Sequence, residues 1–375
     1  MSSRWPWLAV ALAAATSACN VGTDETTVAP PPPADEWDQK LDARVVDYGA
    51  ALRIAALRLT GELPTLGEMS SVTGAADPKA AYAAQIHTYM SGPKFARQMF
   101  HWWQDTMKMG DAPELDTAPA FAAQLTVENR PITDLFTATT GTCPTLDATT
   151  GTFTAHDCAN GTTASGVLTN PGAMKLFFSN FGFRRVRWVQ EVFICSAFPA
   201  EVSTVGQDVH GATPYTGLFP FDSVATLPAG AIDFQNKDSQ LCANCHSNIN
   251  HIAPLLGHFD ENGQYQPAIS VPSPAGGLAQ MKDYLKAGEP TGWRHDKPAA
   301  DIPALGHAIA ADPAATSCVI SRAWNWAMGK SDIVDGGNRV PSDTIATVMQ
   351  SFTASNYKLK DALYQIFTSD DFVRF

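Results

Sequence analysis

Residues 241–265 read LCANCHSNINHIAPLLGHFDENGQY and contain the most specific motif of the chain. Cys242-Ala-Asn-Cys245-His246 follows the C-x-x-C-H spacing at which a c-type haem is attached. Two thiols at this separation can both reach one edge of a porphyrin and form thioethers with its vinyl groups. The next residue then lies beneath the iron. The motif therefore predicts one covalent haem, bound through Cys242 and Cys245, with His246 as an axial ligand.

Two other kinds of site share part of this motif. A thioredoxin-like cysteine pair belongs to a βαβ pattern, and no such pattern surrounds these cysteines. A zinc site needs a second pair of ligands at metal spacing, and the chain has no other C-x-x-C. Haem attachment is therefore the favoured interpretation.

Pro254 follows His246 by eight residues, within the sequence APLLG. In small cytochromes c, a proline-containing loop lies against the proximal imidazole, and its carbonyl accepts the second ring N–H. Such a partner fixes the tautomer and raises the basicity of the ligand. Pro254 is predicted either to play this part or simply to end a helix.

The sequence identifies the second axial ligand less clearly than the first. Met281 is the first candidate, because thioether ligation is common in electron-transfer cytochromes c. Its alternative role is an apolar position on a helix over residues 277–287. The rival ligands are Met328, His251, His258, His295 and His307. A Met/His pair would raise the reduction potential, whereas an open position would permit peroxide or oxygen chemistry.

The N-terminus indicates export. Arg4 precedes a short apolar run, and small residues then lead to Cys19. Residues 1–18 are predicted to be a signal peptide, too short to span a bilayer as a helix. Cys19 is predicted to be the lipidated first residue of a bacterial lipoprotein, with ordinary cleavage near Ala18 as the alternative. Residues 19–34, rich in proline and threonine, would form a tether. The protein is expected in the periplasm or on the outer membrane, touching a membrane only through this anchor.

Composition excludes several classes of protein. The 375 residues are 45% hydrophobic, which is too apolar for a disordered chain. The formal net charge is −12, without a long Lys/Arg run, which argues against nucleic acid as a partner. The chain is long enough to bury a sizeable core without disulfides.

Apolar residues recur at helical spacing through most of the chain, and the expected fold is all-α with little sheet. The expected organisation is an N-terminal helical module (35–136), a Thr/Gly-rich insertion (137–170), a helix with the haem segment (171–275) and a C-terminal helical module (276–375). Helices are predicted over residues 35–59 and 173–195, after Thr65 and after Asp77, and through most of the C-terminal module.

Four cysteines remain once one is assigned to lipid and two to haem. Cys143 and Cys158 lie within the insertion, and an oxidising compartment would join them. Cys195 and Cys318 each lie in an apolar helical segment, where a buried free thiol is the alternative. The even count and export favour a second disulfide, Cys195–Cys318.

Arg184, Arg185 and Arg187 form a local basic cluster. Because carboxylates pair preferentially with arginine, these residues are candidates to bind the haem propionates. A solvated helix face is the alternative.

Three stretches resemble the planctomycete-type cytochrome c proteins, a family also numerous in myxobacteria. They are LRLTGELPTLGEM (57–69) followed by FARQMFHWW, the segment LCANCHSNINHIAPLLGHFDENGQY, and SCVISRAWNWAMGKSDIV with the closing IFTSDDFVRF. The sequence departs from the family in having Asn250-His251 where many relatives have an acidic residue. The resemblance implies a haem protein of the cell envelope and no particular substrate.

The expected function is electron transfer by a mono-haem cytochrome, with a redox partner that the sequence does not identify and no catalytic residue assigned. One alternative is a haem enzyme of peroxidase or oxygenase type, with His295 or His258 as the distal acid–base group. The other is a structural lipoprotein of the envelope.

Overall fold

The computed structural model describes residues 36–196, 240–273, 276–285, 287–293, 297–333 and 339–375, with only the backbone described for 37, 38, 240–245, 247 and 248. The predicted signal peptide, Cys19 and the tether lie outside the described residues. Contacts divide the chain into two units, residues 1–44 and Val45–Phe375. The described part of the first unit contains helix α1 (Glu36–Asp42).

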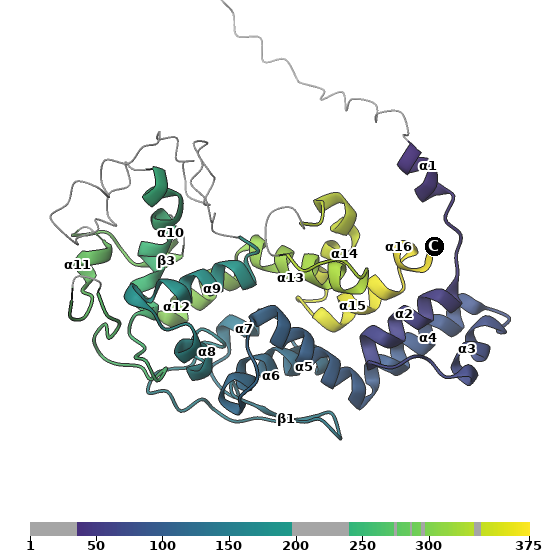
Figure 1. The fold of residues 1–375 in the computed structure, drawn as a ribbon, viewed down its shortest axis with the longest axis horizontal. Helices are drawn as coiled ribbons and strands as arrows, with labels where there is room; N and C mark the ends of the chain where they lie inside the picture. Colours follow the sequence, from purple (N-terminus) through teal and green to yellow (C-terminus); the bar gives the residue numbers. More distant parts are fainter. Residues whose placement is uncertain (1–35, 197–239, 274–275, 286, 294–296, 334–338) are drawn as a thin grey trace, which may run out of the picture. The chain divides into compact units, whose positions relative to one another are not determined.

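The second unit is mostly helical, which confirms the predicted class (Figure 1). Its helices are α2 (Tyr48–Thr60), α3 (Leu66–Thr73), α4 (Pro78–Ser91), α5 (Pro93–Met107), α6 (Pro113–Val127), α7 (Asp134–Thr137), α8 (Pro171–Leu176), the 3-10 helix η1 (Asn180–Gly182), α9 (Phe183–Phe193), α10 (Gln240–Leu256), α11 (Met281–Tyr284), α12 (Ile302–Ala310), α13 (Pro313–Ala327), α14 (Ser342–Ala354), α15 (Leu359–Phe367) and α16 (Asp370–Val373). The described strands form two antiparallel pairs, β1 (Thr145–Asp147) with β2 (Thr152–Thr154) and β3 (Gly292–Trp293) with β4 (Lys297–Pro298).

The helix starts predicted from capping residues are confirmed. The Thr65 hydroxyl accepts from the Glu68 backbone N–H, and the Glu68 carboxylate accepts from the Thr65 N–H, so α3 begins with a capping box. Asp77 caps α4, with a proline at the first helical position. These side chains satisfy backbone N–H groups that have no partner within the helix.

The helix predicted over residues 35–59 is broken in two. Asp47 is extended and caps α2 by accepting from the Gly49 and Ala50 N–H groups. Val45 exchanges two backbone hydrogen bonds with Phe375, each 3.0 Å long. The chain therefore leaves the helical conformation here to pair with the C-terminus, a distant contact that the helical spacing of apolar residues does not reveal.

The prediction of one continuous helix over residues 173–195 is also wrong. The segment contains three separate helices, α8, η1 and α9. Phe181 and Gly182 both have left-handed backbone conformations, with φ of 57° and 67°. The Phe181 N–H donates to the Pro272 carbonyl over 3.0 Å, so a tertiary contact stabilises the break. Apolar residues on both sides keep a helical spacing, which is why the sequence pattern conceals it.

The predicted helix over residues 277–287 shrinks to the four residues of α11. In contrast, α6 was missed because its sequence, PELDTAPAFAAQLTV, contains Pro119 in its interior and a weak apolar stripe. Most of α6 is buried on all sides, and such helices show little periodicity.

The Thr/Gly-rich insertion is partly ordered as a hairpin. β1 pairs with β2, placing Leu146 opposite Phe153, and the Asp147 carboxylate accepts from the Thr149 N–H in the turn. Cys143 and Cys158 are disulfide-bonded at the base of this hairpin, as predicted, with Cα atoms 5.1 Å apart. The end of the insertion, however, is buried rather than a surface excursion, as the 0% exposure of Val167 and Leu168 shows.

Removing the hairpin disulfide should destabilise the protein measurably. The bond closes a loop with a sequence separation of 15 residues, and loss of such a cross-link costs about 3 kcal/mol in the chain-entropy model. We expect the variant Cys143→Ser/Cys158→Ser to lower the free energy of unfolding by that amount in urea denaturation. Unchanged stability, or two free thiols at these positions in the wild-type intact mass, would contradict this assignment.

Cys195 and Cys318 are also bonded, as predicted, with Cα atoms 5.4 Å apart. The bond joins the segment after α9 to α13 and lies in a small apolar cluster with Ile333. The alternative of two buried free thiols is therefore wrong. The pairing matters for the site because α9 also packs against α10, the helix of the C-x-x-C-H motif.

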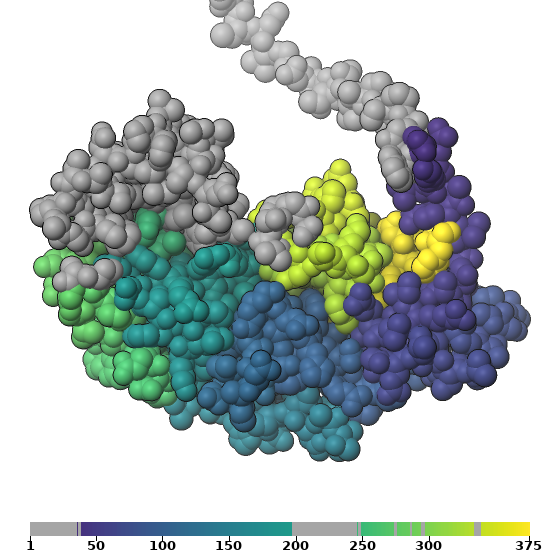
Figure 2. Space-filling model, viewed as in Figure 1, coloured from purple at the N-terminus to yellow at the C-terminus, as the bar shows by residue number. Residues whose placement is uncertain are grey.

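A single large apolar core, to which α2, α4, α5, α6, α13 and α15 contribute, runs through the second unit. Figure 2 shows the teal surface that includes α9 lying directly against the green surface of the residues after 246. Within the described ranges, no helix is both long enough and apolar enough to cross a membrane.

Candidate functional site

The C-x-x-C-H motif lies in the first turns of α10. The motif alone did not predict this helix. Helical geometry puts positions i, i+3 and i+4 on one face, so positions 242, 245 and 246 share a face of α10. The side chains of Cys242 and Cys245 are outside the described part of the chain. The side chain of His246 is described and is partly buried.

The His246 imidazole is held from two sides. Its Nδ1 is 2.8 Å from the amide oxygen of Asn250, one turn further along the helix. Since an amide oxygen only accepts, Nδ1 donates. The ring of Phe183 meets it edge-on, with centroids 4.9 Å apart and planes at 76°.

Burial lowers the pKa of His246, and the hydrogen bond with Asn250 raises it in partial compensation. The imidazole is therefore neutral at pH 7. Because its proton is on Nδ1, the lone pair is on Nε2. A neutral imidazole with an available lone pair is the form that ligates metal ions.

The aromatic ring that contacts this histidine belongs to a larger aromatic cluster. Phe183 stacks on Phe181 with ring centroids 5.2 Å apart, and Tyr284 of α11 meets both rings edge-on. Ile249 of α10 is 7% exposed and adds an aliphatic side chain next to the same turn. Such a cluster would suit the apolar face of a porphyrin and would limit the access of water to a bound haem.

These residues fit a c-type haem. The motif positions share one helix face, His246 presents its lone pair on Nε2, and the described neighbours are apolar or neutral. Among the described residues, no three His, Cys, Asp or Glu side chains come together as a site for a metal ion alone.

Pro254 does not occupy a loop against the imidazole, because it lies inside α10. The interaction expected of its carbonyl is made by the Asn250 side chain. Its alternative role as a helix stop is also not observed, since α10 continues to Leu256.

Met281, the first candidate for the second axial ligand, is the first residue of α11, which packs against α10. Its side chain is 47% exposed, and the alternative, an apolar position on a helix, agrees with its place in α11. Met328 packs against the main core. Ligation by Met281 therefore stays a prediction.

The histidine rivals are placed as follows. His251 is buried on α10 and donates from Nδ1 to the Pro290 carbonyl over 2.8 Å. His258 donates from Nδ1 to the Gln266 carbonyl over 2.9 Å. His307 is exposed on α12, and His295 is outside the described residues.

Arg185 is neither a propionate ligand nor part of a solvated face. Its side chain is 0% exposed, and all five of its N–H donors bond to backbone carbonyls at 2.5–2.9 Å. The acceptors are the carbonyls of Met174, Leu256, Phe259 and Asp260. No donor remains for a haem carboxylate, because a guanidinium has only five.

Arg184 and Arg187 remain as predicted contacts of an anionic group. Arg187 pairs with Glu191 over 2.7 Å, and Arg184 is exposed. Both line a surface groove of about 340 Å³, together with Lys108 and Arg322.

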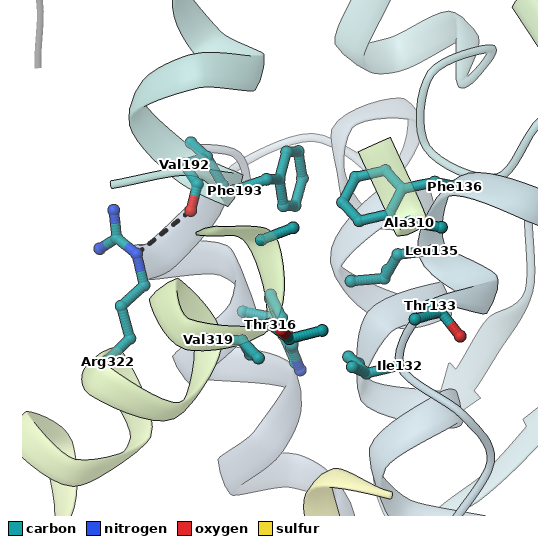
Figure 3. Close-up of a pocket in the computed structure, with 12 residues that line it drawn as sticks. Ile132, Thr133, Leu135, Phe136, Val192, Phe193, Ala310, Thr316, Val319 and Arg322 are labelled. Atoms are coloured by element: carbon teal, nitrogen blue, oxygen red, sulfur yellow. Dashed lines mark hydrogen bonds between the residues drawn. The ribbon is translucent and has the colours of Figure 1, made fainter. Parts of the chain in front are cut away.

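An internal cavity next to α9 is too small to be a substrate site. It measures about 20 Å³, which is space for roughly one water molecule. Figure 3 shows its mostly apolar lining, which includes Phe136 and Phe193, with Arg322 at the edge donating to the Val192 carbonyl. Neither its size nor its lining supports catalysis.

Comparison of the chain with protein-family models, curated proteins and solved structures finds no match. The site therefore rests on its own residues. Sequence reasoning missed Asn250 and Phe183. For Asn250 a signal existed, since an amide four residues after a ligand histidine lies on the same helix face. Phe183 reaches the histidine only through tertiary packing.

Proposed function

We propose that this chain is an exported mono-haem c-type cytochrome that transfers electrons through haem bound by Cys242, Cys245 and His246. One observation carries the proposal: the C-x-x-C-H motif lies on one helix face, with its histidine held by Asn250 in the metal-binding tautomer. Membership of the planctomycete-type cytochrome c family belongs to the same proposal.

When bound, the haem would supply an iron that alternates between the ferric and ferrous states. The protein residues hold and tune it. His246 offers Nε2 as the axial ligand, while Asn250 holds the proton on Nδ1. Phe181, Phe183 and Tyr284 would limit the access of water to the haem, and the resulting low polarity is one of the factors that set a haem reduction potential.

Export supports this function. The two disulfides indicate an oxidising compartment, which agrees with the predicted signal peptide and the predicted lipidation of Cys19. We place the protein in the periplasm or on the outer membrane of a bacterium, where a lipid anchor would hold it near its redox partner.

An optical spectrum tests the proposal. The purified protein, oxidised and then reduced, should show a c-type haem spectrum that carbon monoxide and cyanide leave unchanged. A sulfur-to-iron band in the oxidised form would identify methionine as the second ligand. High-spin iron that binds both ligands would contradict electron transfer and support a haem enzyme. The absence of any haem spectrum would overturn the proposal.

A further inference from the structure

Asn250 is buried completely, and its exposed fraction is 0%. An amide in such a position costs free energy unless its polar atoms are hydrogen-bonded. Here its oxygen accepts from His246 Nδ1 over 2.8 Å, and the two residues are one helical turn apart on α10. A buried polar side chain is thus hydrogen-bonded to the motif histidine.

We propose that Asn250 is the positioning residue of the haem site: its amide oxygen fixes the proton of His246 on Nδ1 and sets how strongly the imidazole donates to the iron. This inference rests on the proposed function. It assigns to a side chain of α10 the part that a backbone carbonyl was predicted to play.

The tautomer is the first consequence. A neutral imidazole can carry its proton on either nitrogen, and a proton on Nε2 would block ligation through that atom. A buried acceptor at Nδ1 makes the productive tautomer the stable one. Phe183, which meets the same ring edge-on at 4.9 Å, restricts rotation of the imidazole about its side-chain bonds.

The strength of the acceptor is the second consequence. An acceptor on the distant ring nitrogen raises the basicity of a metal-bound histidine, and a carboxylate does so more strongly than a neutral group. A more basic ligand stabilises the ferric state over the ferrous state. A neutral amide therefore gives His246 intermediate basicity. The haem is then expected to have a higher reduction potential than it would have with an acidic residue at position 250.

Two substitutions should move the potential in opposite directions. Asn250→Leu has nearly the same shape but no acceptor, so the imidazole becomes less basic and the potential rises. Asn250→Asp offers a carboxylate, so the potential falls. At a fixed ambient potential, we expect each variant to change the ferrous-to-ferric ratio at least tenfold, which corresponds to about 59 mV for one electron. Spectroelectrochemical titration of the haem-loaded full chain measures this ratio.

Ile252→Val is the matched control. It removes one methyl group from another fully buried residue of α10, two positions further along, and should leave the potential unchanged. A purely structural role for Asn250 would shift both variants in the same direction or by no more than the control, and that result would overturn the inference. If Asn250→Leu does not fold, the sign of the Asn250→Asp shift decides alone. A wild-type protein without haem would overturn the proposed function and the inference with it.

Discussion

Replacing Arg185 with methionine should lower the free energy of unfolding by about 4 kcal/mol, because several buried carbonyl groups each lose about 1–3 kcal/mol of hydrogen bonding. Those carbonyls belong to α8, to the last residue of α10 and to the loop after it. Burial lowers the pKa of Arg185 to about 10, so it stays charged at pH 7 while Asp260 partly offsets the effect. Urea denaturation followed by far-ultraviolet circular dichroism measures the loss.

Removal of a buried charge also relieves its desolvation, which acts in the opposite direction. The lost hydrogen bonds decide the sign of the stability change, because the carbonyls stay buried and methionine offers them no donor. Arg187→Met is the matched control: the same substitution on the same helix removes a side chain that is 59% exposed and pairs only with Glu191 in the described structure. Its expected cost is about 0.5 kcal/mol or less. Equal costs for the two variants would refute the role assigned to Arg185.

Arg185 also shows why part of the site could not be predicted. Charged residues are exposed far more often than buried, so three arginines in four positions indicate a solvated or ligand-binding face. The acceptors of Arg185 are backbone carbonyls up to 75 residues away. Every residue has a backbone carbonyl, so a sequence does not show which carbonyls will accept hydrogen bonds from a given arginine. The surroundings of Arg185 therefore could not be predicted before the fold was known.

Local signals, in contrast, were sufficient elsewhere. The capping box at Thr65 requires only residues within one turn, and the structure shows it. Both disulfides followed from counting cysteines in a chain predicted to be exported, and both are present. The failures at Val45 and Phe181 have one cause: a distant backbone partner interrupts a helical pattern that continues on either side. The C-x-x-C-H motif could be recognised from the sequence alone. The acceptor for His246 became clear only when the structure placed Asn250 and His246 on the same helix.

The largest functional effect is expected from the motif cysteines. The variant Cys242→Ala/Cys245→Ala should contain no covalent haem, because thioether bonds to the porphyrin need these two thiols. Intact mass of the protein exported from a host that matures c-type cytochromes would show the wild type heavier by one haem and the variant at the mass of its polypeptide. Spectra taken after denaturation would separate covalent haem from haem that is merely adsorbed.

Cys143→Ser/Cys158→Ser provides the matched control, since it also removes two cysteines from the same exported chain. Those two cysteines are already joined to each other at the base of the β1–β2 hairpin, so they have no thiol to offer a porphyrin. The control should therefore keep its haem while losing stability, and the motif variant should lose its haem entirely. Haem retained in full by both variants would mean that attachment does not use the C-x-x-C-H thiols. A loss in both would mean that haem retention follows the stability of the fold rather than the chemistry of Cys242 and Cys245.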